Sequence, residues 1–109
     1  MIEEYIVNLT KDAEMDLDEI ISYIANDSLQ NALKILNKLE SKVNSLNRMP
    51  ERGRYVPELL DKNIREYREL IENPWRIFYK IDGNEVNVLA IIDGRRNIQE
   101  ILMDKLMRK

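Results

Sequence analysis

The 109-residue sequence contains neither cysteine nor histidine. Without cysteine, the chain can form no disulfide framework and offers no thiolate for catalysis or metal binding. Without histidine, it lacks the most frequent general base and a frequent metal ligand, so any proton transfer would depend on Asp, Glu, Lys or Tyr groups with shifted pKa values. Ser–His–Asp and Cys–His sites are excluded, and no GxGxxG, P-loop or HExxH motif is present. We expect no metal site and no cofactor.

Long hydrophobic runs are also missing, since no segment approaches the roughly 18 apolar residues that a membrane-spanning helix needs. The first nine residues, MIEEYIVNL, carry acidic groups where a signal peptide would carry basic ones. We therefore expect a cytoplasmic protein that makes no contact with a membrane. An apolar fraction of 44% and a charged fraction of 34% are typical of a single globular domain, here spanning residues 1–109.

Arginine is absent from the first 47 residues, which contain four lysines and nine acidic residues and carry a net charge of −5. Residues 48–109 contain all nine arginines and carry a net charge of +2, although the whole chain carries −3. The asymmetry concerns Arg, whose planar guanidinium group suits carboxylate and phosphate partners. It predicts a basic face in the C-terminal half, although arginines that merely suit exposed strands would give the same pattern.

Hydrophobic periodicity predicts a strand and two helices in the N-terminal half. The alternation within residues 5–9 indicates a short strand with one buried face. Thr10 and Ser28 are typical N-cap residues and predict helices that begin directly after them, the first ending near Asn26. Because the connection is short, the helices should form an antiparallel hairpin. Their apolar stripes comprise Ala13, Leu17, Ile20, Ile21 and Ile24 in the first helix, and Leu29, Ala32, Leu36, Leu39, Val43 and Leu46 in the second.

The segment at residues 49–63 reads MPERGRYVPELLDKN, and its two prolines and one glycine predict a loop. Some of its apolar residues are expected to pack on the core, whereas its arginines are expected to contact phosphates or another anionic partner. The expected core residues are Tyr55, Val56 and Leu59, and the arginines are Arg52 and Arg54.

Three runs rich in β-branched and aromatic residues follow, separated by turn signals at residues 72–74 and 82–84. They predict an antiparallel meander whose strands lie at about residues 64–71, 75–81 and 86–92. Alternate side chains of the middle strand should share one face of the sheet, which places Trp75, Ile77, Tyr79 and Ile81 together.

An amphipathic helix closes the chain. Asn97 is a typical N-cap residue, and Glu100 is its capping-box partner. This methionine-rich helix is expected either to dock a partner or to cover the core. Together the patterns predict an α+β fold, in which the helical hairpin packs across one face of a four-stranded sheet.

The order of these elements and several segments resemble the RelE/ParE superfamily of bacterial toxins over nearly the whole chain. The resemblance implies the toxin of a type II toxin–antitoxin module, a plasmid stabilisation or addiction system, which a cognate antitoxin holds inactive. ParE-like members poison DNA gyrase, whereas RelE-like members cleave mRNA on the ribosome. The segments that carry the resemblance are YIVNLTKDAEMDLDEIISYIA, LNRMPERGR, IREYREL, NPWRIFYKI and VNVLAIIDGRRN.

The resemblance places Arg76 and Arg95 at the positions of arginines that serve the mRNA-cleaving members. Those relatives also carry a Tyr or His after the last strand, where this chain has Ile101 and Leu102, neither of which can transfer a proton. This difference and the acidic overall charge favour a ParE-like gyrase inhibitor without chemistry of its own. The alternatives are an mRNA endoribonuclease in which Tyr79 or a Glu replaces the missing base, and a degenerate toxin that only binds antitoxin.

The predicted binding surface for the antitoxin, for gyrase or for the ribosome with mRNA combines arginines with exposed apolar residues. Such a surface suits an acidic partner segment that folds on binding. For Arg76, a structural pair with Glu66 or Glu69 is the alternative. The predicted residues are Arg52, Arg54, Arg65, Arg68, Arg76, Arg95 and Arg96.

Overall fold

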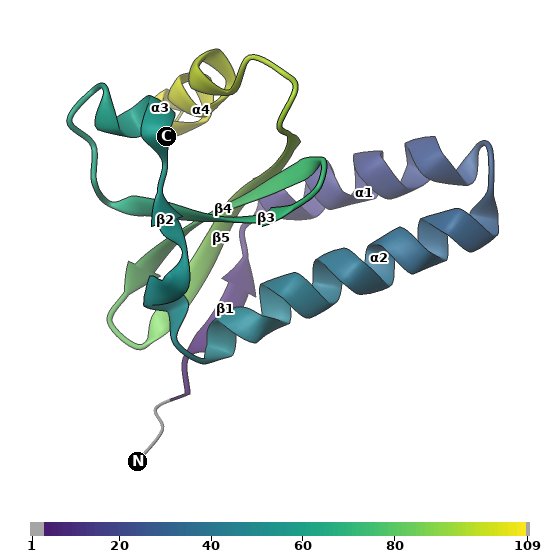
Figure 1. The fold of residues 1–109 in the computed structure, drawn as a ribbon, viewed down its shortest axis with the longest axis horizontal. Helices are drawn as coiled ribbons and strands as arrows, with labels where there is room; N and C mark the ends of the chain where they lie inside the picture. The colour runs from purple at the N-terminus through teal and green to yellow at the C-terminus, as the bar shows by residue number, and fades with distance from the viewer. Residues whose placement is uncertain (1–3, 109) are drawn as a thin grey trace.

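A computed structural model describes residues 4–108 of the chain, which form an α+β fold (Figure 1). Its sheet has the strand order β1-β5-β4-β3-β2, in which β1 pairs in parallel with β5 and the other neighbours are antiparallel. The strands are β1 (Ile6–Leu9), β2 (Arg54–Tyr55), β3 (Tyr67–Glu72), β4 (Trp75–Asp82) and β5 (Glu85–Asp93). The helices are α1 (Lys11–Ala25), α2 (Leu29–Asn44), α3 (Pro57–Leu60) and α4 (Ile98–Met107), with the short 3₁₀ helices η1 (Ser45–Asn47) and η2 (Pro50–Arg52).

The helical hairpin of α1 and α2 begins as the sequence predicts. The Thr10 hydroxyl accepts a hydrogen bond from the Ala13 amide at 3.2 Å, and the Ser28 hydroxyl accepts one from the Asn31 amide at 3.1 Å. Each cap satisfies one of the amide groups that have no partner in the first turn of a helix. The two helices extend side by side beyond the sheet (Figure 1). The predicted hairpin is therefore confirmed.

The hairpin covers one face of the sheet and forms the larger hydrophobic core there. Leu39 is fully buried in this core beside Ile77 of β4, and Leu17 packs against the same cluster. Ile21 and Leu36, which the periodicity also placed in this core, are only half-buried and lie outside the cluster. The apolar stripes of the two helices are thus larger than the surface that the sheet covers.

The opposite face of the sheet carries a second core under α3 and α4. Phe78 is fully buried there, whereas Ile77 and Tyr79 contribute to the larger core, which confirms the predicted alternation of side chains along β4. The terminal helix α4 adds Ile98 and Leu102 to the second core. It therefore covers the sheet, which is one of the two roles that its sequence indicated.

Residues 49–63 contain η2, β2 and α3, where the sequence analysis predicted only a loop. β2 adds a fifth strand to the four that were expected, because Arg54 pairs with Glu69 of β3. β3 begins at Tyr67, three residues later than the predicted start. These short elements depend on contacts with distant parts of the chain and have no strong local signal.

Two of the three side chains expected to pack inward from this segment do so. Val56 and Leu59 are fully buried in the second core. Tyr55 is not, since it remains 41% exposed with the guanidinium carbon of Arg68 4.4 Å from its ring centroid. The expected burial of Tyr55 was therefore wrong, because a cation–π contact on the surface takes the place of packing in the core.

Thr10 and α1 cover the part of β5 that extends beyond β1. β1 pairs with β5 only as far as Val88, so later backbone groups of β5 have no strand on that side. The Thr10 amide donates to the Val88 carbonyl at 3.0 Å, and the Asp16 carboxylate accepts from the Ile91 amide at 3.0 Å. Burial raises the pKa of Asp16, although Lys105 of α4 lies 3.5 Å from this carboxylate. Thr10 and Asp16 of α1 thus supply partners that a neighbouring strand would otherwise provide.

Candidate functional site

Two of the predicted site arginines, Arg54 and Arg76, meet at the buried carboxylate of Glu69. Glu69 accepts a hydrogen bond of 2.6 Å from Nε of Arg54 and another of 2.6 Å from Nε of Arg76. Arg76 also makes a bidentate pair with Glu58 of α3, in which both nitrogen–oxygen distances are 2.8 Å. These four residues, called the Glu69 network below, join β2, β3, β4 and α3.

Arg76 has most of its hydrogen-bonding capacity committed to this network. All three of its nitrogen atoms donate to Glu58 or Glu69. The hydrogen bonds with Glu58 and then with Glu69 raise the pKa of Arg76, and those with Arg76 lower the pKa of Glu58. The Arg76 side chain is only 11% exposed, so an anion from solvent would have to displace a carboxylate to reach it. This geometry is the structural pair with Glu69 that the sequence offered as an alternative.

The side chains of Arg52 and Arg68 donate hydrogen bonds to backbone carbonyl groups. Arg68 donates to the carbonyl groups of Glu51 and Gly53, both at 2.9 Å, and lies over the ring of Tyr55. Arg52 donates to two carbonyl groups in the chain that follows α2, both at 3.1 Å. Neither arginine has an ion pair within residues 4–108, so their charges remain available to a partner on the surface.

Arg65, Arg95 and Arg96 are exposed to solvent. Arg95 pairs with Asp93 at 2.6 Å while its side chain stays 79% exposed, and hydrogen bonds from Arg95 lower the pKa of Asp93 to about 2. Arg65 and Arg96 make no hydrogen bond or ion pair through their side chains with any residue that the structure describes. The seven predicted arginines therefore separate into a pair bound to Glu69, a pair that donates to backbone carbonyl groups and an exposed group.

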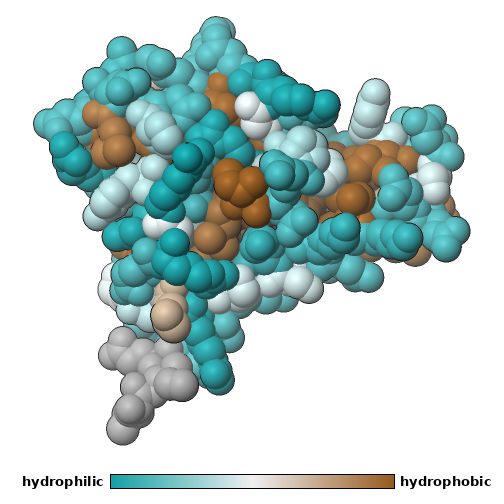
Figure 2. Space-filling view, viewed as in Figure 1, coloured by the Kyte–Doolittle hydropathy of each residue, from teal (hydrophilic) through white to brown (hydrophobic). Residues whose placement is uncertain are grey.

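Arg95 and Arg96 line an apolar groove between the helical hairpin and the β3–β4 turn. The groove, called the hairpin groove below, has a volume of about 740 Å³. Glu19 and Asp93 also line it, so its rim carries both signs of charge. Apolar side chains are visible along the projecting hairpin in Figure 2. The apolar lining consists of Ile20, Tyr23, Ile24, Ile35, Pro74 and Trp75.

Tyr23 is a groove residue that the sequence analysis did not single out. Its side chain is 78% exposed, although it is large and partly apolar. A signal was present, because Tyr23 lies between Ile20 and Ile24 and widens the apolar stripe of α1 beyond what one packed face needs. Exposed apolar groups beside a groove are typical of an interaction surface.

Tyr79, the candidate substitute base, lies in the larger core. It is fully buried, and its hydroxyl donates to the Pro50 carbonyl at 2.5 Å. Gly53 leaves room for this hydroxyl, since a Cβ atom there would collide with the Tyr79 oxygen. Burial raises the pKa of Tyr79, which works against its ionisation. The structure therefore places this hydroxyl out of reach of a substrate.

After β5, the two positions that the sequence analysis singled out hold apolar side chains. Ile101 and Leu102 lie on α4 and pack into the second core. Within residues 4–108, no cluster of carboxylates is arranged to hold a metal ion. Over the same residues, none of the helices combines the length and apolar character needed to cross a membrane.

Comparisons with known proteins agree with this fold. A family model described as the ParE toxin of type II toxin–antitoxin system, parDE, matches residues 7–98. Toxin ParE3 of Caulobacter vibrioides is 30% identical over 90 residues, which are 82% of this chain and 86% of that toxin. A structure of the chromosomal ParDE system from P. aeruginosa has a TM-score of 0.67 at 24% identity, covering 83% of this chain and 96% of that one. The toxin–antitoxin complex RelBE2 from Mycobacterium tuberculosis has a TM-score of 0.63 at 21% identity, covering 84% and 92%.

Proposed function

This chain belongs to the ParE toxin family of type II toxin–antitoxin systems, and we propose that it arrests growth by inhibiting DNA gyrase until a cognate antitoxin neutralises it. Inhibition of this kind requires binding to a large protein target in the cytoplasm. It assigns no catalytic step to the toxin itself.

The observation that carries the proposal is the commitment of Arg76 to Glu58 and Glu69. Cleavage of RNA needs a cation for the developing phosphate charge and a base for the 2′-hydroxyl. Arg76 already faces two carboxylates, and an arginine side chain does not give up its proton near neutral pH. Tyr79 is enclosed, and loss of a general base typically costs about 10²–10⁴-fold in rate. A nuclease built from these residues would be slow.

Binding to a protein target needs shape and charge complementarity, and the hairpin groove offers both. Tyr23 and Trp75 present aromatic surface, which is enriched at the energetic centres of protein interfaces. Arg95 and Arg96 add exposed guanidinium groups beside it. Because the helices extend past the sheet, this surface projects from the body of the molecule (Figure 1).

Two assays on the purified toxin test the proposal: DNA supercoiling by gyrase, and cleavage of mRNA on translating ribosomes mapped codon by codon. We expect supercoiling to stop and mRNA to remain intact. A Tyr23→Ser variant should need about tenfold more toxin for half-inhibition, as for a single interface aromatic. Met107→Ser, which also removes an exposed apolar side chain but lies on α4, is the matched control. Prompt cleavage with unchanged supercoiling would favour the endoribonuclease, and inactivity in both assays would favour the degenerate toxin.

Charge reversal at Arg95 and Arg96 tests the contribution of the groove arginines to antitoxin binding. The double variant R95E/R96E should reduce the association rate constant by about tenfold and weaken its dependence on salt, because exposed interface charges act mainly by steering. Surface plasmon resonance with the product of the adjacent antitoxin gene measures both quantities. The variant K11E/K62E makes the same change in net charge at exposed positions outside the groove. Equal effects of the two variants would contradict a specific role for the arginines.

A further inference from the structure

The two helices of the hairpin carry opposite net charges. α1 contains one lysine and five acidic residues, whereas α2 contains three lysines and one acidic residue. The lysines of α2 recur at every fourth position, as Lys34, Lys38 and Lys42, so they form one stripe along the helix. Lys34 and Lys38 are exposed, and Lys42 is half-buried. The acidic net charge of the N-terminal half therefore conceals a basic stripe made of lysines.

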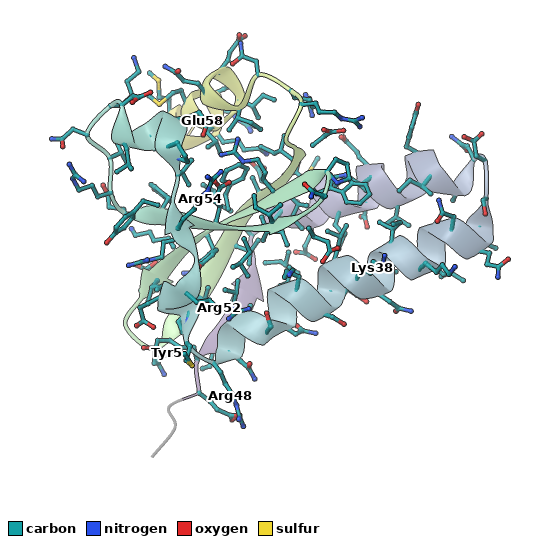
Figure 3. The ribbon with its side chains drawn as sticks, viewed as in Figure 1. Tyr5, Lys38, Arg48, Arg52, Arg54 and Glu58 are labelled. Atoms are coloured by element: carbon teal, nitrogen blue, oxygen red, sulfur yellow. The ribbon has the colours of Figure 1, made fainter. Side chains whose placement is uncertain are left out.

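A groove with a volume of about 530 Å³, called the α2 groove below, lies at the C-terminal end of this stripe. Lys38 and Lys42 of α2 and Arg52 of η2 line it, and Glu72 is the one acidic residue among the described residues of its lining. Figure 3 shows Lys38 on α2 and Arg52 near the end of that helix. Because three cations face a single acid, the α2 groove favours an anionic occupant.

The cations of the α2 groove are available to such an occupant. Lys38 makes no ion pair within residues 4–108. Lys42 lies 3.8 Å from Glu72, and a partly exposed pair of this length contributes little. Nη1 of Arg52 donates to the Ser45 carbonyl at 3.1 Å and Nη2 donates to the Ser45 hydroxyl, which holds the guanidinium group in place. A side chain that is already held loses less conformational freedom when it binds a ligand.

The uncharged lining of the α2 groove is polar. It consists of Asn37, Ser41 and Ser45, whose side chains are suitable hydrogen-bond donors for phosphate oxygen atoms. No apolar side chain of the described residues lines it, in contrast to the hairpin groove with Tyr23 and Trp75. The centres of protein–protein interfaces are apolar and depleted in charge, whereas protein–DNA interfaces are more polar and more positive. The chemistry of the α2 groove therefore fits a nucleic-acid backbone better than a protein segment.

We propose that the α2 groove binds backbone phosphates of the DNA that gyrase holds, while the hairpin groove contacts gyrase itself. The inference rests on the proposed inhibition of gyrase. Ile35 lines the hairpin groove and Lys38 lines the α2 groove, so less than one turn of α2 separates the two sites. Binding at one site raises the effective concentration at the other. The stripe from Lys34 to Lys42 is about 12 Å long, and DNA carries one charge per about 1.7 Å of its axis, so the stripe can meet several phosphates.

Fluorescence anisotropy of a short labelled DNA duplex tests the phosphate contacts without gyrase. Three contacts predict that the logarithm of the association constant falls with the logarithm of the salt concentration at a slope of about −2.7. The variant K38Q/K42Q should lower the affinity at least about tenfold at low salt and make the slope shallower by about 1.8. K11Q/K62Q removes the same charge at exposed positions outside the α2 groove and should bind nearly as the wild type does. Equal affinities and slopes of the two variants would overturn the proposal.

Supercoiling by gyrase with the same variants tests whether this contact serves inhibition. K38Q/K42Q should need about tenfold more toxin for half-inhibition than K11Q/K62Q, and thermal unfolding verifies that both variants are folded. If the wild type inhibits gyrase and the two variants are equally potent, the DNA contact is overturned and the proposed function stands. If the wild type leaves gyrase unaffected, the proposed function fails, and the anisotropy series still decides whether the groove binds phosphates. Loss of antitoxin affinity in K38Q/K42Q without loss of DNA affinity would make the α2 groove a protein contact and overturn the inference.

Discussion

Replacement of Glu69 by alanine is expected to lower the free energy of unfolding by about 3–5 kcal/mol, as for other buried ion pairs that lose one partner. The Glu69 side chain has no exposed surface and accepts hydrogen bonds from Arg54 and Arg76. Arg54 can turn toward solvent, because its side chain is already more than half exposed. Arg76 cannot do so easily, and it would remain buried with only the bidentate pair to Glu58.

Urea unfolding followed by circular dichroism measures this loss. Glu66→Ala is the matched control, since Glu66 is exposed and lies just before β3, and its effect should stay within about 0.5 kcal/mol. A double variant, E69L/R76M, replaces both buried charges with apolar groups and should recover most of the lost stability. A loss below about 1 kcal/mol for Glu69→Ala would show that the network contributes little to stability.

The Glu69 network also explains why the arginines of the sequence do not form one basic face. Glu69 lies seven residues before Arg76 on the adjacent strand, and an interaction across β3 and β4 could be anticipated from the meander. Glu58 lies 18 residues before Arg76, in a segment that carried loop signals, so its pairing could not be anticipated. The arginine count in the sequence is the same whether the charges are exposed or internally neutralised. Only the positions of their acidic partners distinguish the two cases.

Local chemistry was sufficient to predict the longer elements. Thr10 and Ser28 each make the cap hydrogen bond that their position suggested, and Asn97 accepts from the Glu100 amide at 3.2 Å. Alternation along β4 correctly separated its two faces. β2 and α3 were missed because two-residue and four-residue elements have too little periodicity to detect. They form because Val56 and Leu59 are buried and because Arg54 reaches Glu69.

Helical periodicity also could not show which leucines of α2 are the most deeply buried. The difference in burial leads to a prediction with a large effect on stability. Leu36 and Leu39 both belong to the apolar stripe, so the sequence predicts burial of both side chains. In the structure Leu39 is completely buried in the larger core, whereas Leu36 is half-buried and outside that cluster. Leu36 lies on the part of the stripe that neither cluster of buried side chains includes.

Leu39→Ala should therefore lower the free energy of unfolding by about 2–5 kcal/mol, because removal of a buried leucine loses transfer free energy and leaves a cavity. Leu36→Ala removes the same atoms from a half-exposed site and should cost about 1–1.5 kcal/mol. Thermal and urea unfolding of the two variants provide the comparison, and each serves as the control for the other because both sit in the same helix. Similar losses would mean that the two leucines are equally buried in solution. The expected order follows from packing, because Leu39 is buried in the larger core and Leu36 lies outside it.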